Sequence, residues 1–235
     1  MRLLLFILSA ATTSLTAVGQ GSAGVAGTSD YETVNRALYR VRSNAPAVTG
    51  TPFLLPYWTR GYVKMTTGTV ANPWLKYDLA NDRLLWRRPA GDSLELDTNP
   101  ITGFSLGDSL RGERHTFRRY LTSKMADPLL RTAFFEVGYD AGRSALLKRR
   151  SRVLYHDSNR PSLTANRLNK WQEMTLFYLK TTDNTIEPVR LIPKAILAVL
   201  GKAKAPALQA YITRESLDLS AEADLVKLLK YYDTL

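Results

Sequence analysis

WLKYDLANDRLLWR, residues 74–87, predicts two antiparallel strands joined by a tight turn. Side chains suited to strands flank the segment Leu79–Asp82, whose Asn and Asp residues favour turns. An alternation with a period of two also occurs before this hairpin, in Tyr62–Thr67. Further candidate strands follow at intervals of roughly ten residues, at 93–97, 101–106, 115–121, 131–139, 144–155, 172–179 and 186–191. This spacing is typical of an antiparallel meander, a barrel or a sandwich.

The C-terminal segment changes to a helical period. Pro193, Pro206 and Ser220 are placed to begin three short helices, and Gly201 is placed to end the first of them. In the last helix the apolar side chains follow the spacing i, i+3, i+4, i+7, at Leu225, Leu228, Leu229 and Tyr232. The predicted fold class is therefore α+β, with an antiparallel β meander, barrel-like or sandwich sheet followed by a small C-terminal helical segment.

The N-terminus has the pattern of a secretory signal peptide. Arg2 precedes the short apolar run Leu3–Ala11, and small residues close the segment at Ala17–Gly19. The run is too short to span a bilayer, which takes about 20 apolar residues. We therefore expect export to the periplasm or the exterior, with no transmembrane span after signal removal.

The same patterns divide the chain into four parts. We predict a signal peptide at 1–19, and a tether, short helix and proline-rich connection at 20–56. An antiparallel β domain at 57–192 and C-terminal helices packed on it at 193–235 complete the chain.

The composition excludes several kinds of site. The chain has no cysteine and 2 histidines, and its 32 Lys and Arg against 21 Asp and Glu give a net charge of +11. Disulfides, thiolate metal ligands and cysteine nucleophiles are therefore excluded. The histidines have no spacing typical of a metal site, and no glycine-rich phosphate loop occurs. We expect no metal and no cofactor, and the positive charge favours anionic partners or surroundings.

One predicted strand carries the candidate binding site. Lys148, Arg150 and Arg152 share a face of the 144–155 strand, because alternate residues of a strand point the same way. We predict that any anionic partner binds through these three cations, for example through lipid or lipopolysaccharide phosphates. The simpler interpretation is a solvated strand face that discourages edge-to-edge pairing.

No catalytic residue is predicted among the histidines. His156, Asp157 and Ser158 are adjacent at a strand end, so their side chains point to opposite faces and cannot form a relay. His115 lies between Arg114 and Thr116, and we expect it on the surface of the sheet.

Paired carboxylates leave one catalytic alternative open. Glu95 with Asp97 and Glu136 with Asp140 are the close pairs on candidate strands, and two carboxylates can hydrolyse glycosides. Glu136 follows Phe134 and Phe135, so an inward carboxylate there would need a basic partner. We interpret it as a member of a structural ion pair.

The tryptophans are assigned to packing. Trp74 and Trp86 are expected to face each other across the 74–87 hairpin, as aromatic cross-strand pairs do. Exposed tryptophans could instead provide platforms on which sugars stack, but a place in the core is the preferred interpretation.

Three segments together resemble a known group. They are the hairpin of Leu75–Asp78 with Arg83–Trp86, the hairpin of Phe134–Gly142 with Ala145–Lys148, and the ending Leu217–Leu219 with Asp224–Tyr232. The chain resembles uncharacterised exported proteins of Bacteroidetes-type bacteria, over roughly Trp58 to the end. This resemblance implies export and a shared fold, and it implies no reaction.

These observations favour a non-enzymatic binding or scaffolding module of the cell envelope with a basic face. Its expected partner is an anionic envelope component or an envelope protein, and no nucleic acid is expected. The alternatives are a hydrolase of envelope polysaccharide that uses carboxylates, and a structural subunit that docks through its C-terminal helices. The oligomeric state and the ligand stay open.

Overall fold

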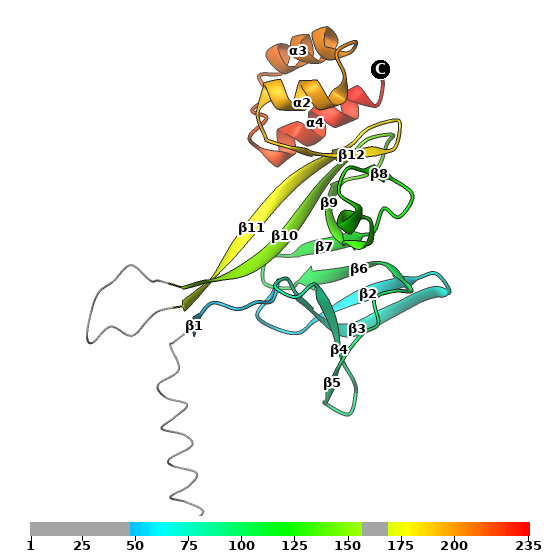
Figure 1. The fold of residues 1–235 in the computed structure, drawn as a ribbon, viewed down its shortest axis with the longest axis vertical. Coiled ribbons are helices and arrows are strands. Elements are labelled where there is room, and N and C mark those ends of the chain that lie inside the picture. The colour runs from blue at the N-terminus through cyan, green and yellow to red at the C-terminus, as the bar shows by residue number, and fades with distance from the viewer. Residues whose placement is uncertain (1–47, 157–168) are drawn as a thin grey trace, which may run out of the picture. The chain divides into compact units, whose positions relative to one another are not determined.

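The computed structural model describes residues 48–156 and 169–235 (Figure 1). The predicted signal peptide, tether and N-terminal helix, as well as Asp157 and Ser158, lie outside the described residues. Residues from Pro46 to Leu235 belong to one compact unit. No described helix has the length and apolar character needed to cross a membrane.

Strands make up most of the regular secondary structure of this unit and helices follow them, so the predicted α+β class is confirmed. The strands are β1 (Val48–Thr49), β2 (Thr59–Met65), β3 (Gly68–Asp78), β4 (Arg83–Arg87), β5 (Ser93–Glu95), β6 (Ile101–Asp108), β7 (Glu113–Arg118), β8 (Lys124–Met125), β9 (Phe135–Tyr139), β10 (Ala145–His156), β11 (Asn169–Lys180) and β12 (Thr185–Val189). The helices are η1 (Pro128–Thr132), α2 (Pro193–Leu200), α3 (Ala205–Arg214) and α4 (Glu222–Tyr232).

All the strands join one sheet with the order β5-β4-β3-β2-β6-β7-β9-β10-β11-β12-β8, and β1 pairs with β11. Neighbours in the sheet are antiparallel except β1 with β11 and β12 with β8, which are parallel. The longest pairing joins β10 to β11. The other edge of β10 pairs with β9. In Figure 1 the helices α2, α3 and α4 lie together beside the ends of β9, β10 and β12.

The 74–87 hairpin forms as predicted, but its register differs by one residue from the expected tryptophan pair. Leu75 lies opposite Trp86, and Trp74 lies opposite Arg87. Asp78 pairs with Arg83, so the turn holds four residues, and Asp82 has a positive φ of 57°. The prediction that Trp74 and Trp86 face each other is therefore wrong, because this turn length offsets the two residues by one position in the register.

Part of the predicted connection belongs to the sheet. Leu54 and Leu55 are buried, and the Leu54 N–H donates to the Tyr77 carbonyl at 2.8 Å. Between Val48 and Pro56 the chain also contributes β1 and the carbonyl of Pro52, which accepts a bond from the Leu79 N–H at 2.9 Å. These contacts hold residues 54–57 in place, and that segment lines one side of the candidate site.

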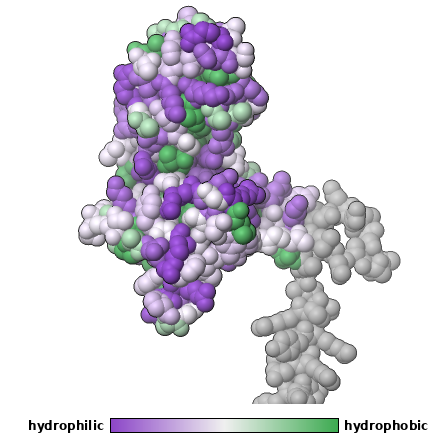
Figure 2. Space-filling view, turned by 180° about the vertical axis from the view of Figure 1, so that it is seen from behind, coloured by the Kyte–Doolittle hydropathy of each residue, from purple (hydrophilic) through white to green (hydrophobic). Residues whose placement is uncertain are grey.

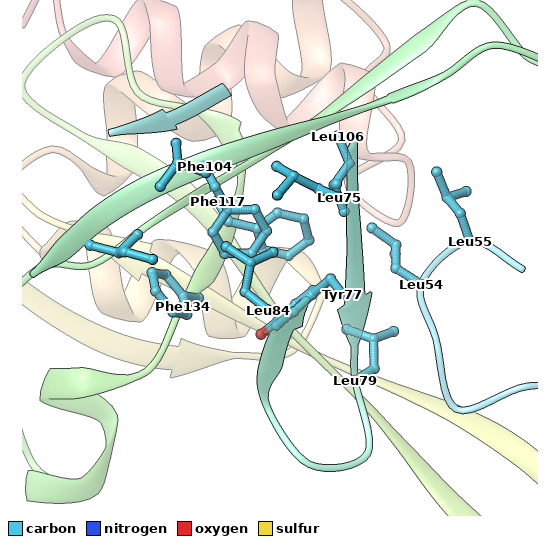
Figure 3. Packing of buried hydrophobic residues seen from close by; sticks show 12 residues of the cluster. Leu54, Leu55, Leu75, Tyr77, Leu79, Leu84, Phe104, Leu106, Phe117 and Phe134 are labelled. Carbon is cyan, nitrogen blue, oxygen red and sulfur yellow. The ribbon is translucent and has the colours of Figure 1, made fainter. Parts of the chain in front are cut away.

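Four aromatic rings form the centre of the core in the β2–β9 part of the sheet (Figure 3). Phe104 stacks on Phe117 at 4.8 Å, and Tyr77 and Phe134 meet Phe104 edge-on at 5.0 and 4.9 Å. Such geometry adds about 0.5–1.5 kcal/mol per pair to the burial of the rings. The cluster holds β3, β6, β7 and the start of β9 against one another.

A second core lies between the helices and the sheet. The predicted stripe of α4 is confirmed, since Leu225, Leu228, Leu229 and Tyr232 are all buried. Ser220 is not the N-cap that the sequence predicts: Ala221 holds that position, and the Ser220 hydroxyl donates to Asp218 instead. Figure 2 shows hydrophilic residues interspersed with small hydrophobic areas on the face that it presents.

Candidate anion-binding cavity

The three predicted cations of β10 act together, but none of them is freely solvated. Lys148, Arg150 and Arg152 each keep 17% of their side-chain surface exposed. Arg150 and Lys148 share Glu136 of β9, with N–O distances of 3.2 and 3.7 Å. Arg150 and Arg152 share Glu173 of β11, at 2.6 and 3.1 Å. Each of these two carboxylates contacts two of the cations. All three cations therefore lie on one face of β10, as the period of two predicts.

A third carboxylate comes from the helices. Glu222 of α4 accepts from the Lys148 ammonium at 3.1 Å. We call the whole group the basic-strand network and define it as Lys148, Arg150, Arg152, Glu136, Glu173 and Glu222. Its three cations face three carboxylates, so the interpretation of β10 as a solvated basic face is wrong. Sequence alone could not show this, because the carboxylates come from three other elements.

Glu136 is the most buried member, with 5% of its surface exposed. Burial by itself raises the pKa of a carboxyl, but a hydrogen bond from His115 and the charges of Lys148 and Arg150 outweigh it. The result is a pKa of about 2. The prediction that this inward carboxylate needs basic partners is confirmed.

His115 completes the site, and its expected place on the sheet surface is wrong. Its Nδ1 lies 2.6 Å from Glu136 Oε1, and the ring is half-buried. An ionised carboxylate only accepts hydrogen bonds, so Nδ1 carries the proton. The contact arises because Phe117 of β7 lies opposite Glu136, and His115 is two residues from Phe117 on the same face.

A cavity of about 360 Å³ opens beside the network. Arg150, Arg152, Glu173 and His115 form one side of it, and Lys148 is not among its lining residues. The other side comes from the 54–57 segment and from the turn between β6 and β7, with Leu54, Leu55, Pro56, Tyr57, Asp108, Leu110 and Arg111. Two of the three predicted anion-binding residues therefore meet at a hollow, and the third points toward α4.

Asp108 fixes the turn between β6 and β7 that lines this cavity. Its carboxylate accepts from the Tyr57 hydroxyl at 2.6 Å and from the backbone N–H groups of Leu110 and Arg111 at 3.0 and 3.1 Å. The bond from Tyr57 lowers the pKa of Asp108. Arg111 is exposed, and within residues 48–156 and 169–235 its side chain has no ion pair. The sequence did not single out Tyr57, Asp108 or Arg111, because only the fold brings them to β10.

The carboxylates of the site are poorly suited to glycoside hydrolysis. That reaction needs one carboxylic acid that is protonated near neutral pH, with a raised pKa. Glu136 and Asp108 both have lowered pKa values. Both oxygens of Glu173 already accept hydrogen bonds from Arg150 and Arg152.

The other carboxylates named from the sequence lie elsewhere and have separate partners. Glu95 pairs with Arg83 at an exposed position, and Asp140 accepts from Arg118 and from the Tyr120 hydroxyl. Glu136 and Asp140 therefore do not share a site. Among the described residues no group of three or more His, Asp and Glu side chains is placed to hold a metal ion.

Comparison of the chain with family models, with curated proteins and with solved structures finds no match. The resemblance to exported proteins of Bacteroidetes-type bacteria therefore stays a prediction. The cavity and its charged lining residues are therefore the basis for a functional proposal.

Glu136 should make stability depend on pH. Its pKa falls from the ordinary value of 4.5 to about 2 on folding. A carboxyl with a depressed folded pKa contributes stability above its unfolded pKa and loses it as the pH falls through the folded value. We expect the free energy of unfolding to drop between about pH 4.5 and pH 2, by up to about 3 kcal/mol from this group.

Urea unfolding of the wild type and of Glu136→Gln at several pH values measures this contribution. The variant should show a shallower loss of stability toward acid, because its amide does not titrate. Exposed carboxylates titrate alike in both proteins, so the difference between the two slopes isolates Glu136. Equal slopes would contradict the assignment.

Proposed function

We propose that this chain is an exported, non-enzymatic binding module of the cell envelope that holds an anionic group of an envelope component. The observation that carries the proposal is the cavity beside β10. It gathers three guanidinium groups, those of Arg111, Arg150 and Arg152, against the two carboxylates of Asp108 and Glu173. Guanidinium groups bind phosphate and carboxylate with two parallel hydrogen bonds, which favours an anionic ligand.

The arginines have different tasks in this proposal. Glu173 and Glu136 hold Arg150 in place, and Glu173 and the Thr51 carbonyl hold Arg152. A cation whose side chain is already held loses less conformational entropy when a ligand arrives. Arg111 has no such partner among the described residues, is exposed and lines the cavity. It is therefore the arginine that is free to turn its guanidinium group toward an incoming anion.

The envelope location rests on the N-terminal pattern of Arg2, the apolar run and Ala17–Gly19. Protein isolated from its native host should begin near Gln20 when its N-terminus is sequenced. An intact Met1 on the purified protein would contradict export and would remove the envelope from the proposal.

Binding to lipopolysaccharide and to vesicles that contain phosphatidylglycerol tests the proposal directly. Arg111→Gln should weaken binding about tenfold, the loss expected for one hydrogen-bonded charge. Raising the salt from 0.1 to 1 M should weaken it further, because the Debye length shrinks from about 10 to about 3 Å. Arg111 is the residue of choice because its loss leaves no buried carboxylate without a partner.

Arg131→Gln is the matched control. Arg131 is also exposed, lies in η1 and does not line the cavity. This variant should bind like the wild type. Equal weakening by both variants would assign binding to net charge alone, and no weakening by either would remove the cavity from the proposal.

A further inference from the structure

A second group of aromatic and cationic side chains lies on β2, β3 and β4, apart from the basic-strand network. Trp74 of β3 lies directly opposite Arg60 of β2 on one side and Arg87 of β4 on the other. Residues opposite each other in antiparallel strands have side chains on the same face, with Cβ atoms about 4.5–5.5 Å apart. The three form a row across the sheet, which we call the Arg60–Trp74–Arg87 row.

The row borders a cavity of about 320 Å³. The β2–β3 register shifts between Arg60 and Tyr62, and Asn72 has a positive φ of 63°, so β3 is irregular beside Trp74. Asn72, Pro73 and Pro89 line the hollow along with the row, and so does Trp86. An irregular strand and two rigid proline rings therefore shape a concave surface where a regular sheet would be flat.

Trp74 is placed to receive a ligand. It is 41% exposed, although tryptophan has the largest apolar surface to bury of all side chains. The Arg60 guanidinium lies 4.2 Å from the centre of its ring, which holds the indole in place by a cation–π contact. Arg60 also donates to the Asn72 carbonyl, so the row and the irregular strand are tied together.

The cations of the row are not neutralised. Arg60 and Arg87 are exposed, and neither has an ion pair within the described ranges 48–156 and 169–235. Arg87 has no side-chain hydrogen bond there either. This differs from β10, where each of the three cations meets a carboxylate. A ligand with negative charge would find these two guanidinium groups free of competing carboxylates.

An aromatic ring between two arginines that have no carboxylate partner suits a ligand with a C–H face and acidic groups. The C–H bonds of a sugar ring pack against the negative face of an indole. The carboxylates of an acidic sugar chain can then accept from guanidinium groups on either side. We propose that the Arg60–Trp74–Arg87 row is a binding site for an acidic polysaccharide of the uronate type. This site is separate from the cavity of the proposed function and does not depend on it.

Calorimetric titration of the full chain with hexagalacturonate tests this site, with neutral maltohexaose as the comparison. Hexagalacturonate should bind at least tenfold more tightly than maltohexaose. Arg87→Gln should weaken hexagalacturonate binding about tenfold by removing one charged donor. Trp74→Ala should weaken binding of both oligosaccharides by a similar factor, because it removes the platform.

Arg88→Gln is the matched control, since it removes the same charge one residue away. Arg88 pairs with Asp92 and does not line the cavity. Neither Arg88→Gln nor Arg111→Gln should change hexagalacturonate binding, and the second of these separates this site from the cavity beside β10. If Trp74→Ala fails to fold, Arg87→Gln decides alone, because that side chain is exposed.

Three results would overturn the proposal. The first is no measurable binding of hexagalacturonate to the wild type. The second is equal weakening by Arg87→Gln and Arg88→Gln, which would mean attraction by net charge. The third is tighter binding of a hexamer of deoxyadenylate than of hexagalacturonate, because bases also stack on tryptophan and this result would assign the row to nucleic acid.

Discussion

Replacing Lys148, Arg150 and Arg152 together with serine is expected to lower the free energy of unfolding by on the order of 3–5 kcal/mol or to prevent folding. The change leaves Glu136 buried, with only His115 as a partner, and leaves Glu173 without its two arginines. A buried carboxylate without its cations pays the cost of lost hydration with no compensating attraction. Urea unfolding monitored by tryptophan fluorescence measures the loss.

A control with the same change in charge separates the network from net charge. Lys64, Lys194 and Lys202 are exposed and belong to no ion pair among the described residues. Their joint replacement by serine should cost no more than about 0.5 kcal/mol per position, as surface changes do. If the β10 triple costs as little as this control, the network does not contribute to stability and the three cations behave as a solvated face.

The sequence alone supports the opposite expectation for this triple replacement. From the alternation of β10, the triple change looks like a test of anion binding with little effect on stability. The structure makes it a test of folding, because Glu136, Glu173 and Glu222 come from β9, β11 and α4. A binding test therefore has to use cations outside the network, such as Arg111 or Arg87.

The sequence predicted the local structure well because that structure depends on residues close in the chain. The turn at Leu79–Asp82, the period of two in the strands and the apolar stripe of α4 are all local patterns. The pairing of strands distant in sequence is not local. Neither the parallel pairing of β1 with β11 nor the approach of His115 to Glu136 follows from alternation.

Only part of the candidate site was predicted, because only part of it depends on residues close in the chain. Glu136 was singled out by its apolar neighbours, and its need for a basic partner followed from the cost of burying a charge. Which cations meet it depends on the register of β9 with β10 and of β7 with β9. The Arg60–Trp74–Arg87 row was missed because the predicted hairpin register was wrong by one residue. It placed Trp86 opposite Trp74, where the structure has Arg87.

Leu228→Ala is expected to lower the free energy of unfolding by about 2–5 kcal/mol, as other large-to-small changes in cores do. Leu228 is fully buried in the middle of the α4 stripe, in a cluster that contains Leu146 of β10, Leu179 of β11 and Leu208 of α3. Removing its methyl groups leaves a cavity. The surrounding side chains come from both the helices and the sheet, so they cannot easily move together to fill it.

The same measurement bears on the remaining functional alternative, in which the C-terminal helices form a docking face for a partner. A docking face requires an exposed apolar stripe, and Leu225, Leu228, Leu229 and Tyr232 are buried within this chain. Leu217→Ala provides the comparison, because that side chain packs at the margin of the cluster and is partly exposed. It should cost clearly less than Leu228→Ala. A loss below about 0.5 kcal/mol for Leu228→Ala, the size typical of surface positions, would restore the stripe as a candidate interface.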